Sequence, residues 1–96
     1  MPSTRLSDAE IITQQRALDS WQVERGELVR TFSFPDFRAS LAFVNQVGEL
    51  AEAAGHHPDI DIRYNRVRLA LVTHDAGGLT AADFTLARKI NGVHSA

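Results

Sequence analysis

The sequence feature that most restricts the fold is one long amphipathic segment with a defined end. Between Asp36 and Ala54, apolar residues recur at helical spacing over about five turns. Gly55 follows, and glycine adopts a left-handed backbone at little cost, while Pro58 cannot continue a helix. The segment therefore predicts a single long helix with one apolar face, ending at Gly55.

Alternating apolar and polar residues on both sides of this helix predict two β-hairpins. Residues 21–34 alternate around a turn at Arg25-Gly26. Residues 59–73 alternate as well, and we place their turn at Asn65-Arg66 because Asn tolerates the left-handed region. Tyr64 then ends the third strand, and Trp21 and Tyr64 are expected in the core or at an interface.

Capping patterns predict a helix at each end of the chain. Ser7-Asp8-Ala9-Glu10 is a capping box, which indicates a first helix to about Leu18. Thr80 and Asp83 form a weaker capping box, and apolar residues at helical spacing follow it in a final predicted helix. The predicted order is α-β-β-α-β-β-α, an α+β fold in which a four-stranded antiparallel sheet carries three helices on one face. A chain of 96 residues suits one such domain, spanning residues 1–96.

Composition excludes several classes of function. The net charge is −2 and the arginines are scattered, so we expect no nucleic-acid partner. Cysteine is absent, which excludes disulfides and thiolate sites. The N-terminus lacks an apolar signal region and no stretch approaches eighteen apolar residues, so we expect no membrane partner and a cytoplasmic location.

Three histidines lie at predicted element ends: His56 and His57 after the long helix, and His74 after the fourth strand. An imidazole gives or takes a proton near neutral pH, so two of them could serve as acid and base. Glu52 lies one helical turn before His56 and could orient that ring. A metal site is the weaker alternative, because adjacent histidines on an extended segment point apart and no His-Glu-x-x-His helix is present. We therefore predict no metal.

The spacing of these residues resembles the signature of the pterin-4a-carbinolamine dehydratases. The matching positions are Glu52, His56-His57-Pro58, Tyr64, His74 and Asp83. The segments around Tyr64-Asn65-Arg66-Val67, Thr73-His74-Asp75 and Gly77-Gly78-Leu79-Thr80 are similar to the family's hairpin and loop. The resemblance covers nearly the whole chain. It implies a dehydratase that converts a 4a-hydroxytetrahydropterin to quinonoid dihydropterin without a cofactor.

The resemblance also implies roles for single residues. His56 and His74 would be the acid/base pair, and His57 would position the pterin. Glu52 and Asp83 would support the histidines or contact the pterin, although a carboxylate at Asp83 also suits a helix N-terminus. Further substrate contacts are expected at Pro58, Thr73 and Asp75. Ile60 departs from the family pattern, since many relatives have an aromatic residue there.

One other interpretation of the function remains open. Some relatives bind proteins instead, as a dimerisation cofactor of a homeodomain transcription factor or as assembly-factor-like homologues of a carbon-fixing enzyme. Retention of three histidines favours catalysis here.

We also expect a homodimer or homotetramer, because an open sheet leaves two edges and the long helix could present some of Phe43, Val44 and Val47 to a partner. His94, in the last helical turn, is expected to complement the helix dipole.

Overall fold

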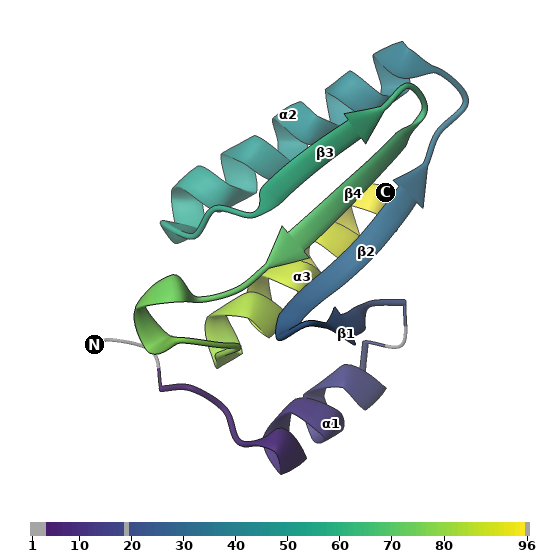
Figure 1. Ribbon diagram of the computed structural model, residues 1–96. Helices are drawn as coiled ribbons and strands as arrows, with labels where there is room; N and C mark the ends of the chain where they lie inside the picture. The colour runs from purple at the N-terminus through teal and green to yellow at the C-terminus, as the bar shows by residue number, and fades with distance from the viewer. Residues whose placement is uncertain (1–3, 19, 96) are drawn as a thin grey trace.

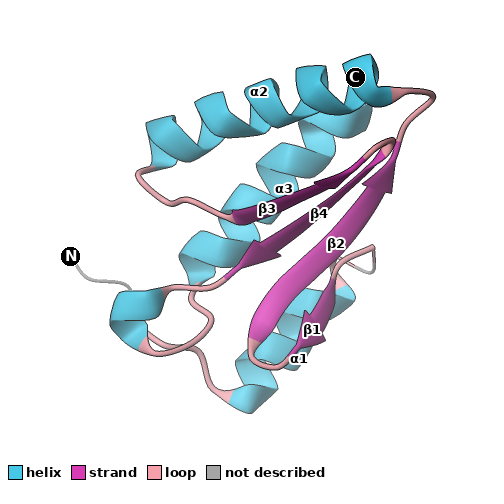
Figure 2. Ribbon diagram, turned by 45° about the horizontal axis from the view of Figure 1, so that its top comes forward, coloured by secondary structure: helices cyan, strands magenta, loops and turns pink. Residues whose placement is uncertain are grey.

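A four-stranded antiparallel sheet with three helices on one face forms the fold, as predicted. The structure is a computed structural model that describes residues 4–18 and 20–95. Helices α2 and α3 lie behind the sheet, and α1 lies beside β1 (Figures 1 and 2). The elements run in the predicted order: α1 (Asp8–Arg16), β1 (Gln22–Glu24), β2 (Glu27–Ser33), α2 (Phe37–Ala54), β3 (Asp59–Arg63), β4 (Arg66–Leu71), a 3₁₀ turn η1 (His74–Ala76) and α3 (Ala81–Ser95).

The sheet has the strand order β1-β2-β4-β3, so the two longest strands lie at its centre. Leu28 of β2 pairs with Leu71 of β4, and Phe32 pairs with Val67. These four side chains are buried in the hydrophobic core with residues of α2 and α3. The period-two alternation thus directs one face of each central strand toward the helices.

The core is aromatic at its centre. Trp21 is fully buried, and its indole N–H donates to Asn91 Oδ1 of α3 at 2.7 Å. The ring of Phe32 lies 4.7 Å from that of Phe43 in α2 and 5.9 Å, edge-on, from that of Trp21. Trp21 is therefore a core residue. The Phe32 ring joins the first hairpin to the long helix.

Helix α2 ends where the sequence predicts. Asp36 caps its start, accepting from the backbone N–H of Ala39 at 2.8 Å. At its other end Gly55 has φ 62°, and the N–H of His56 returns to the carbonyl of Ala51 at 3.1 Å. A left-handed glycine of this kind turns the chain out of the helix axis. His56 consequently lies at the junction of α2 and β3.

The second hairpin differs from the prediction by one residue. Its turn is Tyr64-Asn65, and Arg66 already belongs to β4. Asn65 is tied to the end of β2, since its side-chain amide donates to the Phe34 carbonyl at 3.1 Å and its own carbonyl accepts from the Phe34 N–H at 2.8 Å. Tyr64 therefore takes the left-handed conformation, with φ 52°, and is 66% exposed. Tyr64 therefore does not lie in the core, and its place at an interface stays a prediction.

Helix α2 presents different apolar residues from those expected. Phe43 and Val47 are buried in the core of the single chain, and Val44 is half-buried against it. The large apolar side chains that this helix exposes are Phe37 and Leu41, in its first turns. The stripe faces the sheet directly, because α2 covers β3 and β4 (Figure 2). Within the described residues, no helix combines the length and apolar character needed to cross a bilayer.

His94 packs on an aromatic cluster instead of serving mainly as a charge at the helix end. Its ring lies 4.9 Å from that of Phe32 and 5.8 Å from that of Phe34. Burial, and then the positive charge of Arg30, lower the pKa of His94 below its ordinary value of 6.5. The folded protein thus disfavours protonated His94.

This lowered pKa predicts a pH effect on stability. His94 binds a proton more readily in the unfolded chain than in the folded one. The contribution of neutral His94 to the free energy of unfolding is therefore complete above pH 6.5 and is lost as the pH falls below that value. We expect the Tm to fall on acidification from about pH 7 to about pH 5.5. His94→Phe, which keeps a ring in the cluster, should make that fall smaller. Equal slopes for the variant and the native protein would contradict the assignment.

Candidate functional site

Two of the predicted site residues, His56 and Asp83, bind each other directly. His56 Nε2 lies 2.5 Å from Asp83 Oδ1, although the residues are 27 positions apart. The side chain of His56 is 16% exposed and that of Asp83 is fully buried. The glycine-terminated end of α2 and the first turn of α3 create this contact. It gives His56 an anionic partner on one ring nitrogen.

Asp83 is held by further donors at the start of α3. Its Oδ2 accepts from the hydroxyl of Thr73 at 2.9 Å and from the backbone N–H of Thr80 at 2.9 Å. The second bond is half of the predicted capping box. A helix N-terminus also favours negative charge. Asp83 therefore caps α3 and binds His56 at the same time. Its role as a helix cap is compatible with the predicted role of supporting a histidine.

Glu52 binds His57, not His56 as the helical spacing suggested. The carboxylate Oε2 of Glu52 contacts His57 Nε2. Both side chains are exposed, at 76% and 62%. The expected contact between Glu52 and His56, one helical turn apart, does not form, because Gly55 ends the helix and directs His56 toward α3. The adjacent histidines point apart, as predicted for an extended segment.

His74 lies in a loop that closes on itself and on the N-terminal segment. Thr73 and Gly78 form an isolated bridge, with His74 at the start of η1 between them. The N–H of Leu6 donates to the Leu79 carbonyl at 2.8 Å, and the Arg5 side chain lies over Gly78. A Cβ at Gly78 would lie 2.9 Å from Arg5 Nε, so a glycine allows this approach. His74 itself is exposed.

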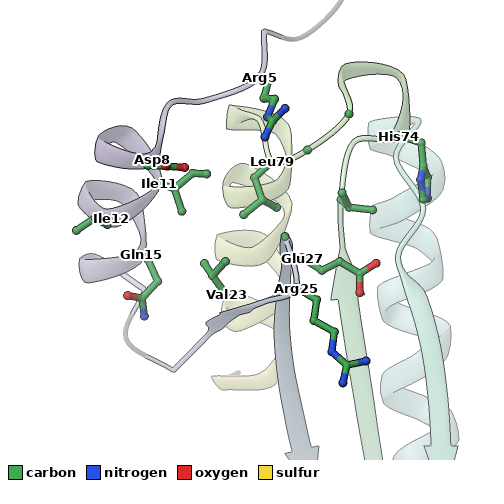
Figure 3. A pocket seen from close by; sticks show the side chains of 14 residues that line it. Arg5, Asp8, Ile11, Ile12, Gln15, Val23, Arg25, Glu27, His74 and Leu79 are labelled. Atoms are coloured by element: carbon green, nitrogen blue, oxygen red, sulfur yellow. The ribbon is translucent and has the colours of Figure 1, made fainter.

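His74 also borders a hollow of about 750 Å³. Ile11 and Ile12 of α1 and Val23 of β1 line one side, and His74 lies on the far side of the β4–α3 loop from α1 (Figure 3). Among the eight predicted site residues, all of which are described, only His74 lines this hollow. His74 thus borders the hollow, and its neighbour in the chain, Thr73, belongs to the hydrogen-bonded cluster. We take the cluster as the candidate site, because proton transfer needs titratable groups and the hollow is largely apolar.

The remaining predicted residues surround this cluster. Pro58 is half-buried between His57 and β3, and Asp75 is exposed in η1. The hydroxyl of Thr73 points into the protein, toward Asp83 and Thr80. Thr80 belongs to the cluster too, although the sequence indicated only its capping role. Its spacing to Asp83 was visible, but its contact with Thr73 depends on the tertiary structure.

Metal ligands do not gather in the described part of the chain. No group of three or more histidine or acidic residues there could hold an ion. His56 and His57 each bind a carboxylate on a different side of their segment. The arrangement is that of two separate histidine–carboxylate pairs, with a third histidine in the neighbouring loop.

Solved structures share this fold. One, described as a transcriptional coactivator/pterin dehydratase from Brucella melitensis, matches with a TM-score of 0.89 and 38% identity, over 94% of this chain and 98% of its own. Another, a pterin dehydratase-like protein identified as a RuBisCO assembly factor in the alpha-carboxysome, has a TM-score of 0.62 and 23% identity. It covers 76% of this chain and 84% of its own, and shows similarity of fold alone.

Sequence comparisons agree. A protein of Chloroflexus aurantiacus with the provisional name pterin-4-alpha-carbinolamine dehydratase is 62% identical over 89 residues, or 93% of this chain and 96% of its own length. One of the same provisional name from Acidobacterium capsulatum is 56% identical over 89 residues, or 93% and 97%. The family model described as Pterin 4 alpha carbinolamine dehydratase matches residues 4–93. The chain therefore belongs to the pterin-4a-carbinolamine dehydratase family.

Proposed function

We propose that this protein removes water from 4a-hydroxytetrahydropterin by general acid/base catalysis. The observation that carries the proposal is the bond between His56 and the buried carboxylate of Asp83, found in a member of this family. A buried carboxylate behind an imidazole fixes the orientation of the ring. His74, exposed in the adjoining loop, is the second acid/base group.

The reaction requires two proton transfers and one bond cleavage. A base takes the proton from N5 of the pterin, the electron pair forms the N5–C4a double bond, and the C4a–oxygen bond breaks. An acid gives a proton to the departing hydroxyl, which leaves as water. The products are quinonoid dihydropterin and water, and proton exchange with solvent restores both imidazoles. Two histidines on different elements can serve the two ends of this reaction.

The other site residues have supporting roles in this proposal. His57, exposed beside Glu52, positions the pterin without entering the proton transfers. Pro58 restricts the backbone after the two histidines. Asp75 is exposed next to His74 and is available to the polar edge of the substrate. Ile60 is 37% exposed and offers an apolar surface where an aromatic ring would stack.

The proposal is tested by the rate of 4a-carbinolamine dehydration in the presence of purified protein. The substrate is generated by an aromatic amino-acid hydroxylase and its decay is followed by absorbance. We expect a rate well above the spontaneous one, proportional to protein concentration. A rate equal to the spontaneous one would refute the proposal.

We expect this activity to be independent of metal. Imidazoles transfer protons directly, and the described residues provide no cluster of three ligands. Exhaustive chelation should leave kcat unchanged, and elemental analysis should find no stoichiometric zinc or iron. Loss of activity on chelation, restored by one particular metal, would contradict this expectation.

We also propose that the chain forms a homodimer or homotetramer. In the described chain, β1 pairs only with Glu27–Val29 of β2. On that side of β2, the backbone of its remaining residues therefore lies at an edge of the sheet. Exposed strand edges favour pairing with another chain. Light scattering at micromolar concentration should give at least twice the mass of one chain, 10.6 kDa. A stable folded monomer would refute this proposal and leave the catalytic one intact.

A second candidate function is binding to another protein. The related Brucella melitensis protein is described as a coactivator as well as a dehydratase. In this chain Phe37, Leu41 and Tyr64 line a shared surface hollow and are exposed apolar residues. Triple replacement by serine would abolish such binding without changing the dehydration rate, which separates the two functions.

A further inference from the structure

The buried carboxylate of Asp83 receives three hydrogen bonds that fill both of its oxygens. Oδ2 accepts from Thr73 Oγ1 at 2.9 Å and from the Thr80 N–H at 2.9 Å, and Oδ1 is 2.5 Å from His56 Nε2. Asp83 and Thr80 are both fully buried. In the described chain no buried side-chain nitrogen or oxygen lacks a partner. The network is therefore complete without water.

The two threonine hydroxyls form a chain with a single direction. Thr73 has one hydroxyl hydrogen, and a carboxylate accepts but does not donate, so this hydrogen lies on the bond to Asp83. The hydroxyls of Thr73 and Thr80 are 2.8 Å apart, so Thr80 must be the donor of that pair. Thr80 Oγ1 in turn accepts from the Ala82 N–H at 3.3 Å. All the hydrogens of the chain point toward the carboxylate.

The same carboxylate determines the tautomer of His56. Oδ2 is occupied by two donors, and Oδ1 can only accept, so neutral His56 must carry its proton on Nε2. Its lone pair is then on Nδ1. Within residues 4–18 and 20–95, Nδ1 has no hydrogen-bond partner, and since no buried polar atom there is unpaired, it reaches the solvent.

We propose that the Asp83 carboxylate fixes His56 in the Nε2–H tautomer, which makes Nδ1 the atom that exchanges a proton with the substrate, and that Thr73 and Thr80 are positioning residues that hold this carboxylate in place. The role of Nδ1 rests on the proposed function, whereas the tautomer itself does not. His57 offers a contrast, because its partner Glu52 is exposed and can turn away. Of these two adjacent histidines, His56 is the one whose proton position is determined by a buried group.

The sharpest test is Asp83→Asn, followed by ¹⁵N NMR of the histidine rings at a pH where they are neutral. The donors from Thr73 and Thr80 require an acceptor, so the amide oxygen should take the place of Oδ2. The amide NH₂ then faces His56 Nε2, which must accept, and the proton should move to Nδ1. The native protein should show protonated Nε2 and the variant protonated Nδ1. In a serine-protease triad the same exchange lowers kcat about 10⁴-fold through the wrong tautomer.

Thr73→Val and Thr73→Ser separate a positioning role from a merely structural one. Valine keeps the shape but removes the hydroxyl. We expect the Nε2–H tautomer to remain, because the carboxylate still only accepts, and kcat to fall by about tenfold, the scale of one hydrogen bond. Serine restores the hydroxyl and should restore kcat. The control is Thr85→Val, at an exposed position of α3, which should not change kcat.

The native spectrum alone can overturn the proposal, even if a variant fails to fold. Neutral His56 protonated on Nδ1 in the native protein would refute it. So would a native tautomer that persists in Asp83→Asn, or an unchanged kcat in Thr73→Val. If native protein shows the expected tautomer but no dehydration, the proposed function fails and the role of Nδ1 in catalysis fails with it, while the hydrogen-bond chain stands.

Discussion

Replacing His56 or His74 by alanine should lower kcat for carbinolamine dehydration by about 10²-fold or more in each case. In the proposed mechanism the reaction needs a base at N5 and an acid at the departing hydroxyl, and each variant would remove one of them. His56 also has a buried anionic partner, so His56→Ala leaves the Asp83 carboxylate without one of its three donors. Stopped-flow absorbance with the purified variants measures the effect, and urea unfolding checks that each variant is folded.

His57→Ala is the matched control, since it removes the same side chain from the adjacent position. His57 is 62% exposed and binds only an exposed carboxylate, so we expect a higher KM with kcat within a fewfold of native. The double variant His56→Ala/His74→Ala should be little slower than the worse single variant, because groups that act as a unit are not additive. Native kcat in both single variants and in the double variant would end the assignment.

The elements that sequence predicted best are those fixed by local chemistry. Gly55 and Pro58 constrain their own backbone, so the end of α2 and the position of the histidine pair follow without knowledge of the rest of the chain. The Ser7–Glu10 capping box is present with both bonds, for the same reason. The order of elements and the antiparallel sheet follow from periodicity, which depends only on which side chains face the core.

The features that the sequence did not predict correctly depend on contacts between distant segments. The second turn begins at Tyr64 because Asn65 binds Phe34, 31 positions away. Likewise, Glu52 binds His57 because the left-handed glycine rotates His56 toward α3. Helical spacing assumes that the helix continues, and here it does not. One-residue differences of this kind change which side chain is exposed, so they matter most at a site.

The sequence names a set of candidate site residues, but it does not predict the hydrogen bonds between them. The resemblance named Thr73 as a substrate contact, whereas in the structure its hydroxyl binds Asp83 and Thr80. Thr80 carried only a capping signal. A capping carboxylate that also binds a histidine looks the same in sequence as one that does not. The distinction lies in the packing of α3 against the end of α2.

Phe32→Ala should have the largest effect on stability. The ring is 1% exposed and contacts those of Trp21, Phe43 and His94, while the guanidinium of Arg30 lies 4.2 Å from its centroid. Its removal leaves a cavity between the sheet and α2, which costs about 3–5 kcal/mol in the free energy of unfolding. For a domain of this size the Tm should fall by at least about 12 °C.

Phe37→Ala is the control for this prediction, because it removes the same side chain from the exposed start of α2. Phe37 is 46% exposed and lies outside the core cluster, so we expect a loss of about 1 kcal/mol or less in the free energy of unfolding. Calorimetry of both variants at one protein concentration measures the difference. The comparison also bears on self-association, since a surface used between copies becomes buried in the assembly. A Phe37→Ala loss as large as that of Phe32→Ala, growing with protein concentration, would place Phe37 in an interface and not on a free surface.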